Sequence, residues 1–241
     1  MLSNSIEPEV EIKRHHSRAP WSYAALDLRQ RDILARVQAG GAGALLLSEV
    51  APVITIGRRT NPGDILLSPE ILKRQGVELH TTDRGGLATY HGPGQWVLFA
   101  VDSLARLTGD SRGVRLAVNG LLEIALEVGR QFEPKAEIRS GAETGVWGPH
   151  GKFAAVGIHI AQGVVLHGLC VNGFRTSTSF VGLRPCGLDL PVGFLLSQVQ
   201  PDGQPEGQEE AFVSLGESLR SAALKKFWNR ESGVDGVTSS G

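Results

Sequence analysis

The stretch that decides the fold is a hairpin signal, Gly151-Lys-Phe-Ala-Ala-Val-Gly-Ile-His-Ile-Ala-Gln-Gly-Val-Val-Leu-His-Gly-Leu-Cys-Val-Asn172. Its two arms, 152–161 and 164–172, are almost wholly apolar. The pair Gln162-Gly163 between them is typical of the tight turn that joins antiparallel strands. The stretch is therefore predicted to form two paired strands connected by a two-residue turn.

A two-residue turn also fixes the register of the hairpin. Gly157 is then opposite Gly168, and Ala155 is opposite Cys170, with all four on one face of the sheet. Cross-strand glycines weaken a sheet, so their presence indicates that a backbone or a ligand approaches closely. Such a patch could be a shallow apolar groove for an alkyl chain, where eight carbons would contribute roughly 5 kcal/mol at about 0.8 kcal/mol per methylene. The alternative is a helix packed tightly on the patch. The flanking side chains are expected to be Phe153, His159 and Leu166.

The segments around the hairpin alternate between strand and helix patterns. Apolar runs predict strands over 44–47, 53–56, 77–80 and 95–101. Helical spacing predicts helices over 21–37, 66–74, 114–128 and 209–228, the second with Ser68 as N-cap and Pro69 as its first residue. The sequence therefore predicts an α+β (mixed α/β) fold that begins with a helix. We expect a single domain over 1–241, with a core over about 20–197, a polar linker over 201–208 and a flexible tail after the closing helix.

The composition excludes several classes of function. The chain has 241 residues and a net charge of −1, with 24 basic and 25 acidic residues, so no nucleic-acid partner is expected. No apolar run approaches the roughly 20 residues that a membrane span needs, and residues 1–18 are too polar for a signal peptide. The 2 cysteines are too few for a disulfide framework, which fits a reducing compartment. A cytoplasmic protein is expected.

The two cysteines have different surroundings. Cys170 lies in an apolar strand, where a small buried side chain is the simple interpretation. Cys186 lies between Pro185 and Gly187, on a sharp loop of the kind that carries catalytic groups. A thiol needs a cation or a base nearby to react at neutral pH, and a partly desolvated lysine can serve. Lys152 is a candidate for that partner, although a lysine at a strand end can equally point into water.

A glycine-rich segment precedes the strand over 95–101. It reads Arg84-Gly-Gly-Leu-Ala-Thr-Tyr-His-Gly-Pro-Gly-Gln95, and such a loop can bring backbone amides close to an anion or a carbonyl oxygen. It matches neither the phosphate-loop pattern nor the dinucleotide pattern. His91 could be a catalytic base or a hydrogen-bonded turn residue. No second histidine lies at metal-ligand spacing, so no metal site is expected.

Four segments, taken in order, resemble the lipoyl(octanoyl) transferases. They are Arg84–Gln95, Gly151–Gly157, His167-Gly168 with Asn172, and Pro185-Cys186-Gly187. The segments Leu45–Glu49 and Val53–Arg58 fit as well, so that the resemblance covers about 20–197. The chain departs from the family's pattern between Asn172 and Pro185, where acidic residues are replaced by Phe174, Thr176 and Ser177.

The resemblance implies a biotin/lipoate protein ligase-like fold and a specific reaction. An octanoyl group would pass from octanoyl-acyl carrier protein to a lysine of a lipoyl domain, the first step of protein lipoylation. The acceptors would be lipoyl domains of 2-oxoacid dehydrogenases and the glycine cleavage H protein. Cys186 would carry the acyl group as a thioester and Lys152 would activate the thiol. Neither a cofactor nor ATP would be needed, and a monomer is expected. The implied substrate-binding residues are Arg84, Gly85, Gly86, Leu87, Ala88, Thr89, Tyr90, His91, Ala155, Val156, Gly157, Gly168, Leu169 and Cys170.

Three other functions compete with this one. An ATP-dependent lipoate or octanoate ligase of the same fold would not need Cys186. A non-catalytic binder of lipoyl domains would leave Cys186 unacylated. A serine hydrolase is suggested by Gly109-Asp-Ser111-Arg-Gly113, which matches the nucleophile-elbow pattern, but 104–108 is a poor candidate for the strand that must precede such a serine.

Overall fold

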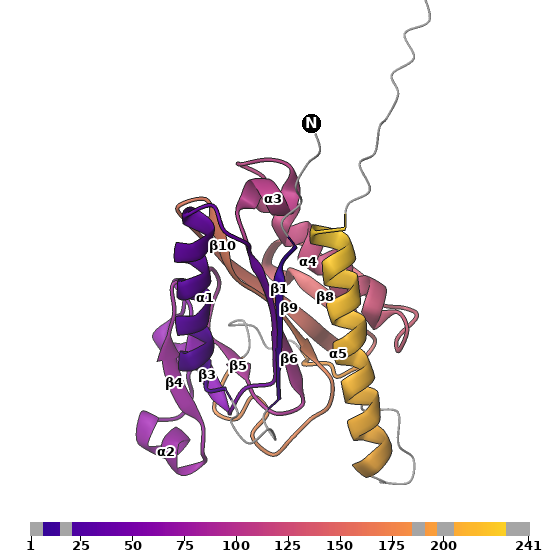
Figure 1. Cartoon of the computed structure of the whole chain (residues 1–241). Coiled ribbons are helices and arrows are strands. Elements are labelled where there is room, and N and C mark those ends of the chain that lie inside the picture. Colours follow the sequence, from indigo (N-terminus) through magenta and orange to yellow (C-terminus); the bar gives the residue numbers. More distant parts are fainter. Residues whose placement is uncertain (1–6, 15–20, 185–190, 197–204, 230–241) are drawn as a thin grey trace, which may run out of the picture.

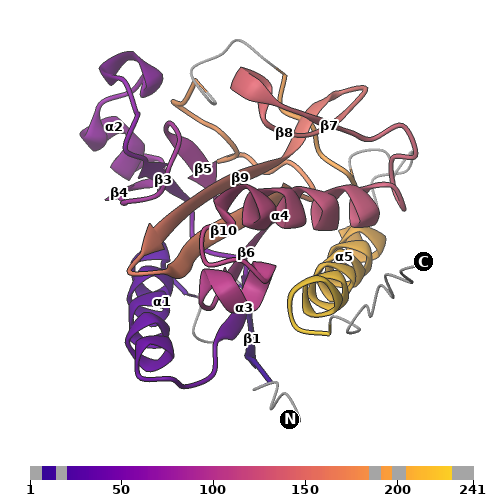
Figure 2. The same ribbon diagram turned by 90° about the horizontal axis from the view of Figure 1, so that it is seen from above.

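The computed structural model describes residues 7–14, 21–184, 191–196 and 205–229. Within these ranges the chain forms a large mixed sheet and a small sheet, with helices on both faces of the large one (Figures 1 and 2). The large sheet has the strand order β1 (Glu9–Lys13), β2 (Ala44–Ser48), β6 (Gln95–Val101), β10 (Val164–Asn172), β9 (Gly151–Ala161), β8 (Gly145–Gly148) and β7 (Glu137–Arg139). The small sheet has the order β4 (Glu78–Thr81), β3 (Val53–Ile56) and β5 (Thr89–His91).

Two hydrophobic cores form against the two faces of the large sheet. One face is covered by α4 (Val114–Gly129) and α5 (Pro205–Phe227), with α3 (Leu104–Thr108) at their edge (Figure 2). The opposite face is covered by α1 (Tyr23–Gln38), whose Leu26 and Ile33 are fully buried. The alternation of side chains along β2 and β6 supplies both cores, because successive residues of a strand point to opposite faces.

The small sheet has a third core of its own. This core includes Leu72 of α2 (Pro69–Arg74). Two short 3₁₀ turns, η1 (Pro62–Asp64) and η2 (Gly141–Glu143), complete the described elements. Ser68 caps α2 by accepting a hydrogen bond from the Ile71 N–H, and Pro69 is the first helical residue, as the sequence predicts. The helix begins there and not at Leu66.

The hairpin has the predicted register. Gly157 is opposite Gly168 and Ala155 is opposite Cys170. The turn residues Gln162 and Gly163 both have positive φ, 50° and 82°, which is the backbone of the turn type that matches the twist of a hairpin. A two-residue turn of this kind allows only one register between the two strands, so the sequence of the turn is enough to predict the pairing.

One prediction about the hairpin is wrong, and a β-bulge is the reason. Val146 of β8 is opposite Ala154, but Trp147 is opposite Lys152, so Phe153 has no partner on β8. Phe153 packs with Ala154 in the core beneath α4 and not beside the groove. The extra residue also changes the alternation, and therefore Lys152 lies on the face of Ala155.

Several boundaries differ from the prediction. The first element is β1, not a helix, and α5 begins at Pro205, so 205–208 is helical and not linker. Strands β5, β7 and β8 are too short to give a clear pattern. Cys186 lies outside the described residues, as does the predicted tail. Among the described helices, none is long and apolar enough to cross a membrane.

Candidate active site

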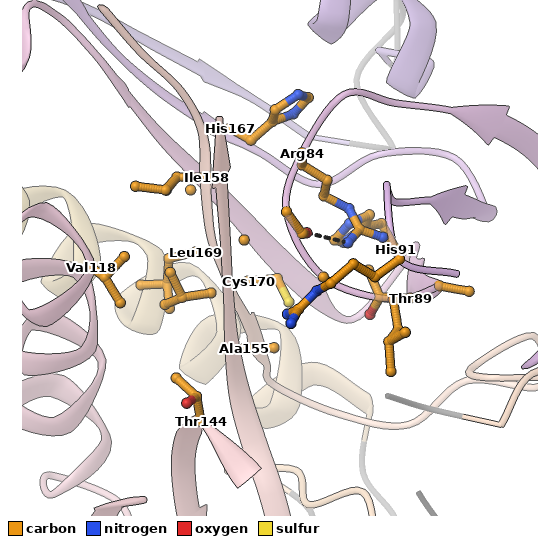
Figure 3. A pocket seen from close by; sticks show the side chains of 18 of the residues that line it. Arg84, Thr89, His91, Val118, Thr144, Ala155, Ile158, His167, Leu169 and Cys170 are labelled. Atoms are coloured by element: carbon orange, nitrogen blue, oxygen red, sulfur yellow. Dashed lines mark hydrogen bonds between the residues drawn. The ribbon is translucent and has the colours of Figure 1, made fainter. Parts of the chain in front are cut away.

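A cavity of about 340 Å³ lies between the glycine-rich loop and the β9–β10 hairpin. Arg84, Thr89, His91 and Cys170 lie on one side of the hairpin, whereas Val118 and Leu169 lie on the other (Figure 3). The lining therefore draws on both faces of the hairpin. Beyond Ala154, β9 is no longer paired with β8, and this part of its edge faces the glycine-rich loop.

The glycine-rich loop is held between the two sheets. The buried guanidinium of Arg84 donates hydrogen bonds to the carbonyl oxygen of Thr55 at 2.8 Å and to its Oγ1 at 2.9 Å, which fixes the loop to β3. On the other side the Gly85 N–H donates to the carbonyl oxygen of Ile158 in β9 at 3.0 Å. Arg84 thus has a structural role as well as a place in the cavity wall.

The cavity gathers nearly all of the residues that the resemblance implies. Of the substrate-binding residues named above, Tyr90 alone is absent from the lining. Its hydroxyl group lies 2.8 Å from Oγ1 of Thr178, and its ring packs in the core of the small sheet. This follows from strand alternation, because Thr89 and His91 point to the cavity side of β5 and Tyr90 points away. Tyr90 therefore holds the loop over 174–184, the part of the chain that departs from the family's pattern.

Burial lowers the pKa of His91 to about 3, so its imidazole is neutral at neutral pH. Its Nδ1 lies 2.6 Å from Oε1 of Gln95, whose amide nitrogen donates to Oδ1 of Asn172 and to the Tyr90 carbonyl. Nδ1 must therefore carry the proton and donate it to Gln95, which leaves Nε2 as an acceptor. The ring stacks on Tyr23 with centroids 5.3 Å apart. A neutral, stacked ring is a fixed part of the wall and a weak base.

The two hairpin glycines are explained by backbone approach. A Cβ at Gly157 would lie 3.1 Å from the carbonyl oxygen of Gly85, and a Cβ at Gly168 would collide with the carbonyl oxygen of Leu98. The partner of the Gly157 patch is therefore the glycine-rich loop, not the helix that the sequence left as an alternative. The cavity remains between this loop and the hairpin.

Lys152 lines the cavity together with Thr144 and with Gly141 and Ala142 of η2. The bulge at Phe153 turns it to this face, as described above. Its side chain passes over Gly145, where any Cβ would overlap it, and its Nζ lies 5.9 Å from the ring centre of Trp147. Gly145 and Trp147 therefore fix the path of the side chain toward the cavity.

Residues that follow Cys186 in the chain are hydrogen-bonded to the backbone of Lys152. The Lys152 N–H donates to the carbonyl oxygen of Pro191 at 2.9 Å, and the Gly193 N–H donates to the carbonyl oxygen of Lys152 at 2.9 Å. Asn172 adds a side-chain hydrogen bond to the Gly193 carbonyl at 3.0 Å. The first described residues after Cys186 thus lie directly beside Lys152.

Cys170 is buried and lines the cavity opposite Ala155. Several other lining residues were not predicted from the sequence: Tyr23, Arg59, Phe99, Val118, Gly141, Ala142, Thr144, Ile158 and His167. Four of them, Tyr23, Phe99, Val118 and Ile158, are apolar or aromatic residues of core helices and strands, which have no signal that separates them from ordinary packing. His167 lies within a segment of the resemblance, so its place could have been found there.

The serine-hydrolase alternative is excluded by the local structure. Residues 104–108 form α3, and Gly109 ends that helix with a left-handed backbone, φ 79°. A nucleophile elbow requires a strand before the serine. Ser111 lies in the loop between α3 and α4 instead, and the two glycines around it are explained by the helix ends. Among the described residues, no three acidic, histidine or cysteine side chains gather as a metal site.

Comparison with known proteins agrees with this geometry. The family model of the lipoyl protein ligase A/B catalytic domain matches residues 23–213. An octanoyltransferase of Magnetococcus marinus is 38% identical over 75% of this chain and 80% of its own length. An octanoyltransferase of Caldicellulosiruptor bescii is 38% identical over 68% of this chain and 71% of its own length. The chain therefore belongs to the lipoyl protein ligase A/B family, on its octanoyltransferase branch, and is an enzyme of the acyltransferase class.

Solved structures show the same fold. A putative lipoate protein ligase of T. acidophilum with bound lipoic acid superimposes with a TM-score of 0.60 at 13% identity, covering 93% of this chain and 98% of that one. A lipoate-protein ligase A bound with ATP superimposes with a TM-score of 0.62 at 14% identity, covering 93% of this chain and 97% of that one. The biotin/lipoate ligase-like α+β fold predicted from the resemblance is confirmed.

Proposed function

We propose that this enzyme transfers an octanoyl group from an acyl carrier protein to a lysine side chain of a lipoyl domain. The observation that carries the proposal is that Lys152 lines the cavity, with the chain that follows Cys186 hydrogen-bonded to its backbone. The identity to the octanoyltransferases supports the acyl group, and the cavity offers an apolar wall to its chain. The acceptors would be lipoyl domains of 2-oxoacid dehydrogenases and the glycine cleavage H protein.

In the first half-reaction the thiolate of Cys186 attacks the carbonyl carbon of the donor thioester. The new bond is the thioester of Cys186, and the bond that breaks is the one to the carrier's sulfur. Lys152 in its neutral form takes the proton from the thiol and returns it to the departing thiolate of the carrier.

In the second half-reaction the amine of the acceptor lysine attacks the acyl-cysteine. An amide forms, the Cys186 thioester breaks, and the proton lost by the amine passes through Lys152 to the cysteine. The thioester of the donor already supplies the free energy for both steps. The mechanism therefore requires no ATP.

The second candidate is an ATP-dependent ligase of the same fold. A lipoate-protein ligase A bound with ATP has the same fold as this chain, and this shared fold is the observation that favours the ligase. A ligase would adenylate a free acid and would not use Cys186. A binder that does no chemistry would hold the lipoyl domain and leave the thiol unacylated.

The test is a transfer assay with octanoyl-acyl carrier protein and an apo lipoyl domain, read by the mass of the domain. Octanoylation without ATP, and its loss in Cys186→Ser, supports the proposal. Octanoylation only from free octanoate with ATP would make the protein a ligase. Transfer by Cys186→Ser at near the wild-type rate would refute the acyl-cysteine.

A further inference from the structure

Asp83 lies one residue before the glycine-rich loop and outside the lining of the cavity. Its Oδ1 accepts a hydrogen bond from Nε2 of His167 in β10 at 2.9 Å. Its other oxygen, Oδ2, faces solvent-exposed Arg31 at 3.5 Å and His159 at 3.8 Å. The bond to His167 is therefore the shortest of these contacts, and it is partly buried.

His167 has a backbone that a histidine rarely adopts. Its φ is +60°, in the middle of a strand, and its side chain is 1% exposed. The surroundings hold it there. Its N–H donates to Oε1 of Gln30 at 2.8 Å, and its Nδ1 lies 3.2 Å from the Tyr23 hydroxyl and 3.3 Å from Nε2 of Gln30. Helix α1 thus fixes one edge of the ring and Asp83 fixes the other.

The proton of the ring can be placed from these contacts. Because Oε1 of Gln30 accepts the backbone N–H, the other end of that amide is the donor that faces Nδ1. Burial raises the pKa of Tyr23, so its hydroxyl also remains a donor toward Nδ1. Nδ1 is therefore an acceptor, and the proton lies on Nε2, where it is donated to Asp83.

The charge on Asp83 is consistent with this arrangement. Partial burial favours its neutral acid, but the hydrogen bond from His167 and the basic side chains nearby outweigh it, so the pKa of Asp83 is lowered. Burial also lowers the pKa of His167. The pair is a carboxylate that accepts from a neutral imidazole, a strong hydrogen bond without a second buried charge.

The position of this pair determines what it can do. The start of the glycine-rich loop is tied to the small sheet, through Arg84 to Thr55 and through the Thr82 N–H to the Ile56 carbonyl. The same part of the loop is also tied to the hairpin. Asp83 accepts a hydrogen bond from His167 of β10, and the Gly85 N–H donates one to the carbonyl oxygen of Ile158 in β9. The cavity lies between the glycine-rich loop and the hairpin. A bond that joins them sets how far the loop stands from the hairpin.

We infer that Asp83 is a positioning residue for this enzyme, which holds the glycine-rich loop at its distance from the hairpin by accepting the hydrogen bond of His167. The inference deepens the proposed function, because the loop and the hairpin are the walls that would bind the acyl donor. Asp83 does not touch the substrate. Its loss should therefore weaken donor binding and loosen the loop, and leave the acyl chemistry largely unchanged.

The test compares Asp83→Ala, Asp83→Asn and the control Arg31→Ala. The alanine variant loses the acceptor, whereas the asparagine variant keeps an oxygen that can accept from Nε2 of His167. The control removes the ion pairs of Arg31 with Asp83 and with Asp27 and leaves the bond between Asp83 and His167. We expect about a tenfold rise in KM for octanoyl-acyl carrier protein in Asp83→Ala, with kcat changed much less, and values near wild type in the other two.

Hydrogen exchange of the amides over 84–91 provides a second readout that needs no catalysis. Faster exchange there in Asp83→Ala, with wild-type exchange in Asp83→Asn and Arg31→Ala, supports the inference. Equal exchange in all variants overturns it. Equal loss of kcat in Asp83→Ala and Asp83→Asn with an unchanged KM also overturns it. If the wild-type protein transfers no octanoyl group, the proposed function fails, and the exchange data alone decide the role of Asp83.

Discussion

Ala155→Leu should shorten the acyl chain that the enzyme accepts. Ala155 lies on the cavity face of β9, opposite Cys170, and its methyl group forms part of the wall. Leucine adds about three carbon atoms to this wall and excludes a similar length of the substrate's chain. At about 0.8 kcal/mol per methylene, the lost burial is roughly 2.4 kcal/mol. This corresponds to about a 50-fold loss in kcat/KM for octanoyl, since about 1.4 kcal/mol is tenfold.

The assay is a comparison of kcat/KM for butanoyl, hexanoyl and octanoyl donors on the same carrier. The variant should lose most with octanoyl and least with butanoyl, because the shorter chain does not reach the filled part of the cavity. Ala105→Leu is the matched control, since it adds the same atoms at an exposed position of α3. An unchanged octanoyl rate in Ala155→Leu, or an equal loss with all three donors, would refute the assignment of this cavity to the acyl chain.

The other predictions concern the thiols, the lysine and the buried histidine. Lys152→Met should lower transfer at least 100-fold with an unchanged thermal midpoint, by the usual range for a lost acid–base group; activity within tenfold of wild type would exclude it as the proton carrier. Cys170→Ala should keep most activity, and complete loss in a folded variant would contradict its role as lining. Ser111→Ala should be fully active. The pKa of His91 is lowered to about 3, so the unfolded chain binds a proton that the folded one does not, and the free energy of unfolding should fall as the pH falls through about 6.5. From pH 7 to 5 this loss is about 2 kcal/mol, and a denaturant series in which His91→Gln shows the same slope as wild type would contradict it.

The fold was predictable wherever a local pattern allows one geometry. The turn Gln162-Gly163 determines the hairpin register, and the strands over 44–47, 53–56 and 95–101 lie within a residue of β2, β3 and β6. The bulge at Phe153 was not predictable, because Phe153 and Ala154 are both apolar and either could face the core. Strand β1 was missed because it is short, largely charged and held by pairing with β2.

The site was predictable where its residues have no ordinary structural use. The glycine-rich loop is marked by its composition, and the hairpin patch by its two glycines. Val118 and Phe99 have no such mark, because an apolar residue that lines a cavity follows the same pattern as one in the core. The pair Asp83 and His167 joins residues 84 positions apart, and only the tertiary structure brings them together.

The most direct test of the central claim is the intact mass of the protein after incubation with octanoyl-acyl carrier protein in the absence of ATP. The account predicts a gain of one octanoyl group that hydroxylamine removes, because a thioester is cleaved by it and an amide is not. The gain should be absent in Cys186→Ser and present in Cys170→Ala. No gain in a protein that still octanoylates a lipoyl domain, or a gain that persists in Cys186→Ser, would contradict the acyl-cysteine mechanism.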